Sequence, residues 1–334
     1  MSAVLSRPAR ILAVDDEPTN LQLLRQILQE QYGLLFAKDG ERALQLAQQE
    51  RPDLILLDVM MPGMTGYDVC RRLKSVEATA AIPIIFVTAL ADTADELTGF
   101  EAGAVDYISK PVSPPIVKAR VRTHLSLVRM DELRETRLQI VQRLGLAAEY
   151  KDNETGLHVI RMSHYARLLG LAAGMNEQQA DDLLHAAPLH DVGKIGIPDR
   201  ILQKPGKLDP DEWRIMQTHV AIGANIIGQH ERGVLAMAHR IALSHHEKWD
   251  GSGYPSGLAG EAIPLEGRIV AVADVFDALT SVRPYKKAWS LEEALQYLRD
   301  NRDQHFQPAL VDLFMTLIPQ VREIMQRWAE QAGS

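Results

Sequence analysis

The sequence predicts two domains of different fold class: an α/β domain with a doubly wound parallel sheet, followed by an all-α domain, with a long helix joining them. Three observations carry this prediction. The chain has 334 residues, the length of about two ordinary domains. Short apolar runs alternate with helical segments over the first 125 residues. After residue 140 the apolar spacing becomes helical and strand-like alternation is absent.

Five short apolar runs predict the strands of the first domain. They are residues 11–14, 34–37, 54–57, 84–87 and 107–108. A segment with helical spacing follows each run, and the first such segment places four leucine and isoleucine side chains on one face: Leu21, Leu24, Ile27 and Leu28. Repeated β/α units predict a parallel sheet covered on both faces. Ligands of such sheets bind at the carboxyl ends of the strands.

Polar residues occupy those carboxyl ends. Asp15 and Asp16 follow the first run, Asp58 the third, Thr88 the fourth and Lys110 the fifth. Carboxylates that meet at one rim are suited to bind Mg²⁺ and leave Asp58 as a nucleophile toward a phosphoryl donor. Taken singly, Asp and Thr at these points are more often helix caps. Their joint occurrence favours the phosphoacceptor site.

The segments VDDEPTN, LILLDVMMPGMTG, FVTA and YISKP resemble a response-regulator receiver domain over roughly residues 8 to 125. The resemblance implies a flavodoxin-like fold, a sensor histidine kinase as partner and Asp58 as the phosphoacceptor. It implies Mg²⁺ held by Asp15, Asp16, Asp58 and the Met60 carbonyl. Thr88 and Lys110 would contact the phosphoryl group. Tyr107 resembles the aromatic switch of the family, and a half-buried strand aromatic is the alternative.

The last helix of the first domain is predicted to continue as a linker. From residue 115 to about residue 150 the only glycine is Gly145, and apolar residues recur at loosely helical intervals. We predict a receiver domain at 1–125, a linker helix at 126–140 and the second domain at 141–334. Such a helix suits pairing with its copy in a homodimer. Because the heptad register breaks near Asp131, a solvated strut is the alternative.

Histidine and carboxylate residues cluster in the second domain. Ten of the eleven histidines follow residue 150. The pattern contains eight candidate metal ligands: Glu154, His158, His190, Asp191, His219, His245, His246 and Asp274. Imidazole and carboxylate groups together hold divalent metals side by side, and paired metals stabilise the attacking and leaving oxygens of a phosphodiester displacement. The sequence therefore predicts a multinuclear metal hydrolase acting on a phosphodiester.

The spacing within this set predicts a shared cavity. Glu154 and His158 are four residues apart and share one face of a helix. His190 and Asp191 are adjacent and would leave a helix about 100° apart, so they fit one cluster only if the carboxylate bridges two ions. Lys194 follows at helical spacing and would neutralise a phosphate oxygen, with a solvated surface lysine as the alternative. We expect Asp191 and Lys194 to be catalytic. For six other histidines we favour core or surface roles: His124, His164, His185, His230, His239 and His305.

The segments HDVGKIGIPDRIL, HHEKWDGSGYP and VADVFDALTSVRPYKKA resemble an HD-GYP domain of the HD superfamily, the family of cyclic di-GMP phosphodiesterases, over roughly residues 140 to 334. The resemblance implies that the eight residues above bind metal. It implies substrate contacts from Asp152, Lys194, Gly253, Tyr254, Arg283 and Lys286. Family members with the early glutamate can hold three metals, usually iron or manganese, so Glu154 favours three over two; nickel and zinc also accept this ligand set. One departure is Gln307, where the family generally has an aspartate at a helix cap.

The expected reaction is hydrolysis of cyclic di-GMP to linear pGpG, with further cleavage to GMP left open. Our hypothesis is an in-line attack by water activated between two metals that Asp191 bridges, while Lys194 stabilises the phosphoryl charge. Phosphorylation of Asp58 is expected to change access to this site, in a direction that the sequence leaves open. A cyclic di-GMP sensor without activity and a different nucleotide phosphohydrolase are the alternatives.

Composition argues against several other classes of protein. The single cysteine, Cys70, excludes a disulfide framework. No signal-like segment opens the chain and no apolar run approaches the roughly 18 to 20 residues that span a bilayer, so we expect a cytoplasmic protein without membrane insertion. The net charge is −8, and no basic helix-turn-helix follows the receiver. We therefore expect no DNA partner.

Overall fold

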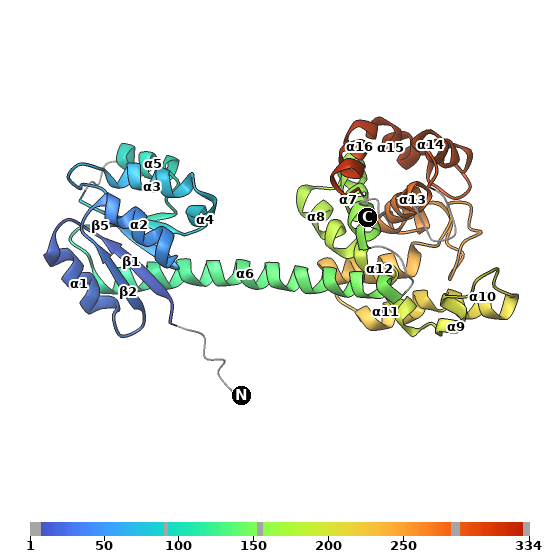
Figure 1. Ribbon diagram of the computed structural model, residues 1–334, viewed down its shortest axis with the longest axis horizontal. Coiled ribbons are helices and arrows are strands. Elements are labelled where there is room, and N and C mark those ends of the chain that lie inside the picture. Colours follow the sequence, from blue (N-terminus) through green and yellow to red (C-terminus); the bar gives the residue numbers. More distant parts are fainter. Residues whose placement is uncertain (1–7, 90–92, 152–155, 282–287, 330–334) are drawn as a thin grey trace, which may run out of the picture. The chain divides into compact units, whose positions relative to one another are not determined.

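The computed structural model describes residues 8–89, 93–151, 156–281 and 288–329. The chain divides into two compact units, Met1–Arg134 and Glu135–Ser334. The first unit contains a parallel sheet and the second is built from helices (Figure 1). No helix within the described ranges is both long and apolar enough to cross a membrane.

Five parallel strands form the centre of the first unit. They are β1 (Arg10–Val14), β2 (Gly33–Ala37), β3 (Leu54–Asp58), β4 (Ile84–Thr88) and β5 (Asp106–Ser109). Their order in the sheet is β2-β1-β3-β4-β5. Each predicted apolar run lies inside its strand, which extends it by at most one residue at either end. β3 and β4 are buried at every position, which explains why they read as continuous apolar runs.

Helices cover both faces of this sheet, which confirms the predicted doubly wound class. One core contains the buried faces of α1 (Pro18–Leu28) and of the first turns of α6 (Pro114–Lys151). The opposite core contains the buried faces of α2 (Gly40–Glu50) and α3 (Gly66–Lys74). The short α4 (Glu77–Ala80) and α5 (Thr93–Glu101) complete the unit. Because all strands run in parallel, their carboxyl ends lie at the same edge.

The predicted long helix is α6, which is continuous over 38 residues. Its residues from Glu135 onward belong to the second unit. A Cβ atom built on Gly145 would lie 2.4 Å from the carbonyl oxygen of Pro188. Any larger residue would therefore collide with backbone, so the single glycine of this helix allows α6 to lie directly against the Pro188 backbone within the second unit.

The described residues of the second unit contain helices and no β-strand, as predicted. The α-helices are α7 (Gly156–Ala172), α8 (Glu177–Ala186), α9 (Asp199–Leu202), α10 (Pro210–Gln217), α11 (His219–Ile227), α12 (Val234–Ser244), α13 (Leu265–Thr280), α14 (Leu291–Asp300), α15 (Pro308–Thr316) and α16 (Ile318–Arg327). Three 3-10 helices intervene: η1 (Ala187–Leu189), η2 (Val192–Gly196) and η3 (Gly260–Ala262). Tyr165, Phe276 and Phe314 pack edge to face at the centre, with ring centroids 4.9 to 6.5 Å apart.

Candidate metal centre and phosphoacceptor site

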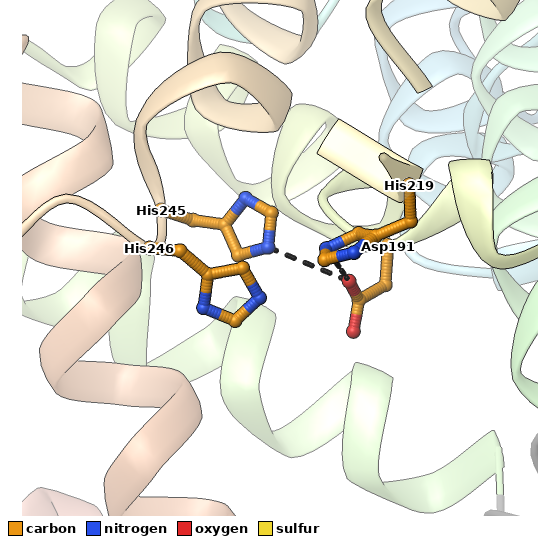
Figure 2. Close-up of side chains that lie close together, drawn as sticks. All are labelled: Asp191, His219, His245 and His246. Atoms are coloured by element: carbon orange, nitrogen blue, oxygen red, sulfur yellow. Dashed lines mark ion pairs between the residues drawn. The ribbon is translucent and has the colours of Figure 1, made fainter. Parts of the chain in front are cut away.

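Seven histidines and aspartates of the second unit gather into two groups. The ligand atoms of each group lie within 4.8 Å of one another. The first group is Asp191, His219, His245 and His246, whose side chains face one another in Figure 2. The second group is His158, His190 and Asp274. These are seven of the eight ligands that the sequence predicted, and the eighth, Glu154, lies outside the described residues.

Separate elements position these side chains. His158 lies on α7 and Asp274 on α13, two helices that pack against each other. His219 begins α11. His245 and His246 directly follow the end of α12. The site is therefore assembled by tertiary packing of the helices.

His190 and Asp191 do not lie on an α-helix, so the predicted 100° offset between them was wrong. They lie between η1 and η2. Pro188 in η1 lacks the N–H that would continue the preceding α-helix. A Cβ atom at Gly193, in η2, would lie 1.9 Å from the carbonyl oxygen of His219. Glycine therefore permits the close approach of η2 and α11 that brings Asp191 to His219.

The two carboxylate oxygens of Asp191 face different partners. Oδ1 lies 3.1 Å from Nε2 of His219 and 3.4 Å from Nε2 of His245, as the dashed lines in Figure 2 mark. Oδ2 lies 3.3 Å from Nε2 of His190 and 2.9 Å from Nζ of Lys194. One oxygen therefore faces the first group, and the other faces a member of the second. In the second group, Oδ1 of Asp274 lies 3.3 Å from Nε2 of His158 and 3.9 Å from Nε2 of His190.

Backbone carbonyls orient three of the imidazole rings. The Nδ1 atom of His190 lies 3.0 Å from the carbonyl oxygen of Ala187. The Nδ1 atom of His219 lies 2.7 Å from that of Met216, and the Nδ1 atom of His245 lies 3.1 Å from that of Ile241. A carbonyl only accepts hydrogen bonds, so Nδ1 carries the proton in each ring. The lone pair of Nε2 then points into the cluster, which is the tautomer that a metal ligand requires.

The first group fits a divalent cation. Within the part of the chain that the structure describes, three of its atoms are buried and make no hydrogen bond: Oδ1 of Asp191, Nε2 of His219 and Nε2 of His245. Each buried polar atom left in this way costs about 1 to 3 kcal/mol. These three atoms already converge, and a cation between them would satisfy all three at once.

Electrostatics favour the ligand-competent protonation states in this group. Burial opposes the charge of Asp191, yet Lys194 and His190 hold its pKa well below the usual range. Burial and the neighbouring His245 lower the pKa of His246 well below its ordinary value. Burial also lowers the pKa of His245, although Asp191 opposes this shift. An ionised carboxylate and neutral imidazoles are the forms that bind metal.

The glycine-rich loop after His246 forms a wall of the site. The Tyr254 ring stacks on His246 with centroids 4.7 Å apart, and the Tyr254 N–H donates to the His246 carbonyl. A Cβ atom at Gly253 would collide with the backbone of Glu247 and Lys248. The Tyr254–Pro255 peptide bond is cis. The loop therefore lies against the first group.

Sequence reasoning missed two buried carboxylates near the site. Glu247 is 2% exposed and accepts backbone N–H groups of Ser256 and Leu258 at 2.8 and 3.0 Å, which holds the loop in place. Asp277 is fully buried and contacts His158. The available signals were weak: Glu247 directly follows the histidine pair, and Asp277 lies one helical turn after Asp274.

Other predicted residues lie elsewhere. Asp152, Arg283 and Lys286, three of the predicted substrate contacts, lie outside the described residues. Lys194 lies beside Asp191, as expected from its spacing. Neither metal-ligand group in the described ranges includes any of the six remaining histidines.

The predicted phosphoacceptor residues meet at the carboxyl edge of the sheet. Ligand atoms of Asp15, Asp16 and Asp58 lie within 4.8 Å of one another. Lys110 Nζ lies 2.9 Å from Oδ2 of Asp15 and 3.0 Å from Oδ2 of Asp58. These four residues, together with Met60, line a cavity of about 620 Å³. Burial raises the pKa of Asp58 despite the opposing effect of Lys110.

The two remaining receiver residues lie on the neighbouring strands. Thr88 ends β4, is buried, and accepts the Lys110 backbone N–H at 2.7 Å. Tyr107 on β5 is half-buried, packs edge to face with Phe100 and lies under the Arg120 guanidinium. This arrangement is compatible with both interpretations of Tyr107.

Comparison with known proteins matches both units. Residues 11–122 match the response regulator receiver domain and residues 133–310 match the HD domain. A Vibrio cholerae protein named "Probable cyclic di-GMP phosphodiesterase" is 40% identical over 97% of this chain and 81% of its own. A Xanthomonas campestris pv. campestris protein named cyclic di-GMP phosphodiesterase response regulator RpfG is 40% identical over 94% of this chain and 89% of its own. A second Vibrio cholerae protein, named 3'3'-cGAMP-specific phosphodiesterase 2, is 49% identical over 56% of this chain and 36% of its own.

Two of these relatives align with nearly the whole chain, and the matched domains follow each other in the order that the sequence predicted. Both resemblances found in the sequence are thereby confirmed. The chain belongs to the family of cyclic di-GMP phosphodiesterase response regulators, in which a receiver domain precedes an HD domain.

Proposed function

We propose that this chain hydrolyses cyclic di-GMP to pGpG at the metal centre of its HD domain, under control of phosphorylation at Asp58. One observation carries the proposal. The two ligand groups meet at Asp191, whose carboxylate oxygens face one group each. A carboxylate placed in this way suits two ions held side by side, the arrangement used in hydrolysis of phosphodiesters.

The seven described ligands would hold two divalent ions, and Glu154 would add a ligand for a third. Iron and manganese are the metals we favour, and nickel or zinc also suits histidine and carboxylate. Divalent ions at this site would supply Lewis acidity and lower the pKa of a coordinated water. Whether the product is pGpG alone or also GMP depends on how the second phosphodiester is held.

The side chains around the ligands have distinct proposed roles. Asp191 bridges the two groups and fixes their separation. Lys194, whose Nζ lies 2.9 Å from Oδ2 of Asp191, is placed to bind a phosphoryl oxygen and balance its charge. Gly253 and Tyr254 would position the nucleotide against the loop. Further substrate contacts are proposed for Asp152, Arg283 and Lys286.

In the receiver we propose transfer of a phosphoryl group from a sensor histidine kinase to the Asp58 carboxylate. Mg²⁺ would bind Asp15, Asp16, Asp58 and the Met60 carbonyl. Lys110 and Thr88 would contact the transferred group, and Tyr107 is proposed as the residue that responds to it. The contact between half-buried Lys110 and Asp58 supports this assignment, because an ammonium beside the acceptor offsets the added negative charge.

We also propose that the chain forms a homodimer through α6. This helix exposes large apolar side chains at three-, four- and seven-residue intervals: Leu127, Met130, Leu133, Ile140 and Leu144. Pairing with a second copy would bury them. The net charge of −8 supports the expectation that DNA is not a partner.

The proposed reaction is tested by chromatography of products after the metal-loaded full chain is incubated with cyclic di-GMP. We expect pGpG to appear, and we expect Asp191→Ala to lose both turnover and bound metal. His239→Ala is the matched control, because His239 is half-buried and lies outside both ligand groups. Full activity in Asp191→Ala would refute the assignment, and binding of cyclic di-GMP without turnover would make the chain a sensor.

A second substrate has specific support. The relative with 49% identity over the HD portion is named for activity on 3'3'-cGAMP. Parallel incubations with cyclic di-GMP, 3'3'-cGAMP and pGpG would rank the substrates by kcat/KM. A higher kcat/KM for 3'3'-cGAMP would leave the proposed metal centre unchanged and would replace cyclic di-GMP as the proposed substrate.

A further inference from the structure

His158 differs from three other candidate ligands in the kind of acceptor that its Nδ1 atom contacts. His190, His219 and His245 each use a backbone carbonyl. In His158, Nδ1 lies 2.8 Å from Oδ2 of Asp277, a carboxylate with no exposed surface. A carboxylate behind a metal-binding histidine fixes the ring and increases the basicity of the opposite nitrogen.

Asp277 is itself held by several donors. Arg161 donates from Nε to Oδ1 at 2.7 Å and from Nη2 to Oδ2 at 2.9 Å. Ser281 Oγ donates to Oδ2 at 2.8 Å. The two guanidinium bonds form a fork that fixes the plane of the carboxylate. Asp277 therefore has little freedom to turn away from His158.

The guanidinium of Arg161 is also held by groups other than Asp277. Nη1 of Arg161 donates to the Trp328 carbonyl at 3.0 Å, and Nη2 donates to Ser281 Oγ at 2.6 Å. Arg161 is 6% exposed. Its position is thus set by the chain after α16 as well as by α13.

The supporting pair lies one helical turn from the ligand pair on the same two helices. On α7, Arg161 follows His158 by three residues, and on α13, Asp277 follows Asp274 by three residues. Residues three apart lie on one helix face. Where α7 packs against α13, one turn of each helix therefore carries a candidate ligand, His158 or Asp274. The next turn carries the buried ion pair of Arg161 and Asp277.

We propose that Asp277 and Arg161 are positioning residues for the metal subsite of His158, His190 and Asp274. Asp277 accepts a hydrogen bond from the Nδ1–H group of His158 and keeps Nε2 directed toward Asp274, and Arg161 holds Asp277 in that orientation. The inference rests on the proposed metal centre. It predicts that the two subsites respond differently, because His219 and His245 of the first group are oriented by backbone carbonyls and not by Asp277.

A purely structural role is the competing explanation. A buried ion pair that loses one partner destabilises a fold by about 3 to 5 kcal/mol, whatever else it does. Such a loss would lower the melting temperature of the metal-free protein. It would not remove one metal equivalent selectively while leaving the other bound.

The test is Asp277→Asn in the full chain, loaded with Mn²⁺. Asparagine keeps the shape of the side chain and lacks the negative charge. We expect one equivalent to be held about 10 to 100 times more weakly than in the wild type in a chelator competition, as measured by mass spectrometry of bound metal. The remaining equivalent should keep wild-type affinity. The spectrum of the Co²⁺-loaded protein gives a second readout, because the ligand field at one ion changes.

Asp181→Asn is the matched control. Asp181 also pairs with an arginine of α7, and the Nε of Arg167 lies 2.7 Å from its Oδ1. Neither residue belongs to a ligand group, so metal affinity should equal that of the wild type. Unchanged affinity for every equivalent in folded Asp277→Asn would overturn the inference. A wild-type protein that binds no divalent metal would instead overturn the proposed metal centre.

Ser281→Ala provides a milder variant if Asp277→Asn does not fold. It removes one donor to the oxygen that faces His158 and leaves the Arg161 ion pair in place. We expect a severalfold weakening at the same single equivalent. Wild-type binding by this variant would overturn the inference.

Discussion

Replacing Gly193 with alanine tests whether the approach of η2 to α11 sets the geometry of the metal centre. The new Cβ atom would lie 1.9 Å from the His219 carbonyl oxygen and 2.5 Å from the Gly223 nitrogen. Both neighbours are backbone atoms, and Cβ contacts below 3.0 Å are essentially not found in proteins. The two segments must therefore separate by about 1 Å or more, and the added strain should cost about 1 to 3 kcal/mol of unfolding free energy.

The catalytic cost should be larger than the cost in stability. Asp191 lies two residues before Gly193 and Lys194 one residue after it, while His219 lies on the opposing segment. A displacement of about 1 Å in an active site lowers rate by about 100-fold, or about 2.7 kcal/mol in transition-state free energy. The assay is kcat/KM for cyclic di-GMP, with thermal unfolding measured in parallel.

Gly196→Ala is the matched control in the same 3-10 helix. The nearest atoms to its new Cβ are in the Ile222 side chain, at 2.9 and 3.0 Å, and this side chain is free to change rotamer. We expect activity within about threefold of the wild type, because moving a side chain about 30° from its rotamer costs about 0.5 to 1.5 kcal/mol and leaves the backbone around Asp191 in place. Wild-type kcat/KM in Gly193→Ala would refute the link between this backbone contact and the metal centre.

Three further predictions follow from other parts of the chain. Gln307 is the N-cap of α15 and makes no cap hydrogen bond, because its Oε1 accepts from Arg268 instead. Gln307→Asp should raise the unfolding free energy by about 1 kcal/mol in a denaturant titration. A decrease would show that the contact with Arg268 matters more than the cap. Burial, reinforced by Lys248, lowers the pKa of His305 to about 4. Between pH 6.5 and about 4 the unfolded chain therefore binds more protons than the folded chain, and stability rises with pH. His305→Gln should reduce the loss of stability between pH 7 and pH 5 by up to about 2 kcal/mol, and an unchanged pH profile would contradict this. Beryllofluoride should change the turnover of wild-type protein by about 5- to 150-fold and leave Asp58→Asn unaffected, whereas equal rates with and without it would show that the two domains are uncoupled.

The strands and the receiver site could be predicted because they depend on local patterns. Each strand contains a short apolar run, and residues of the site mark the strand ends, such as Asp58 at the end of β3 and Thr88 at the end of β4. In a parallel sheet the carboxyl ends of all strands lie at one edge, so the sequence alone predicts that residues at these ends lie close together. The all-helical class of the second unit likewise follows from apolar spacing alone.

The second site was predicted less completely because its geometry depends on contacts between distant segments. The 3-10 geometry at His190 and Asp191 depends on Pro188 and on the contact of Gly193 with α11, and the periodicity of the sequence reveals neither. Asp277 was missed because a carboxylate on a helix usually faces solvent. Its partner Arg161 lies 116 residues earlier, so no spacing rule connects the two.

The glycine contact on α6 has a mechanical consequence for signalling. At Gly145 the helix lies directly on the backbone of Pro188, with no side chain between them to absorb movement. Pro188 belongs to η1, and the adjacent Ala187 carbonyl holds the ring of His190. A shift of α6 at this point would have to displace the Pro188 backbone, which lies two residues before the candidate metal ligand His190. The end of α6 and the candidate metal centre are therefore joined by a contact between backbone atoms, and substitutions of ordinary surface side chains along α6 would leave that contact intact.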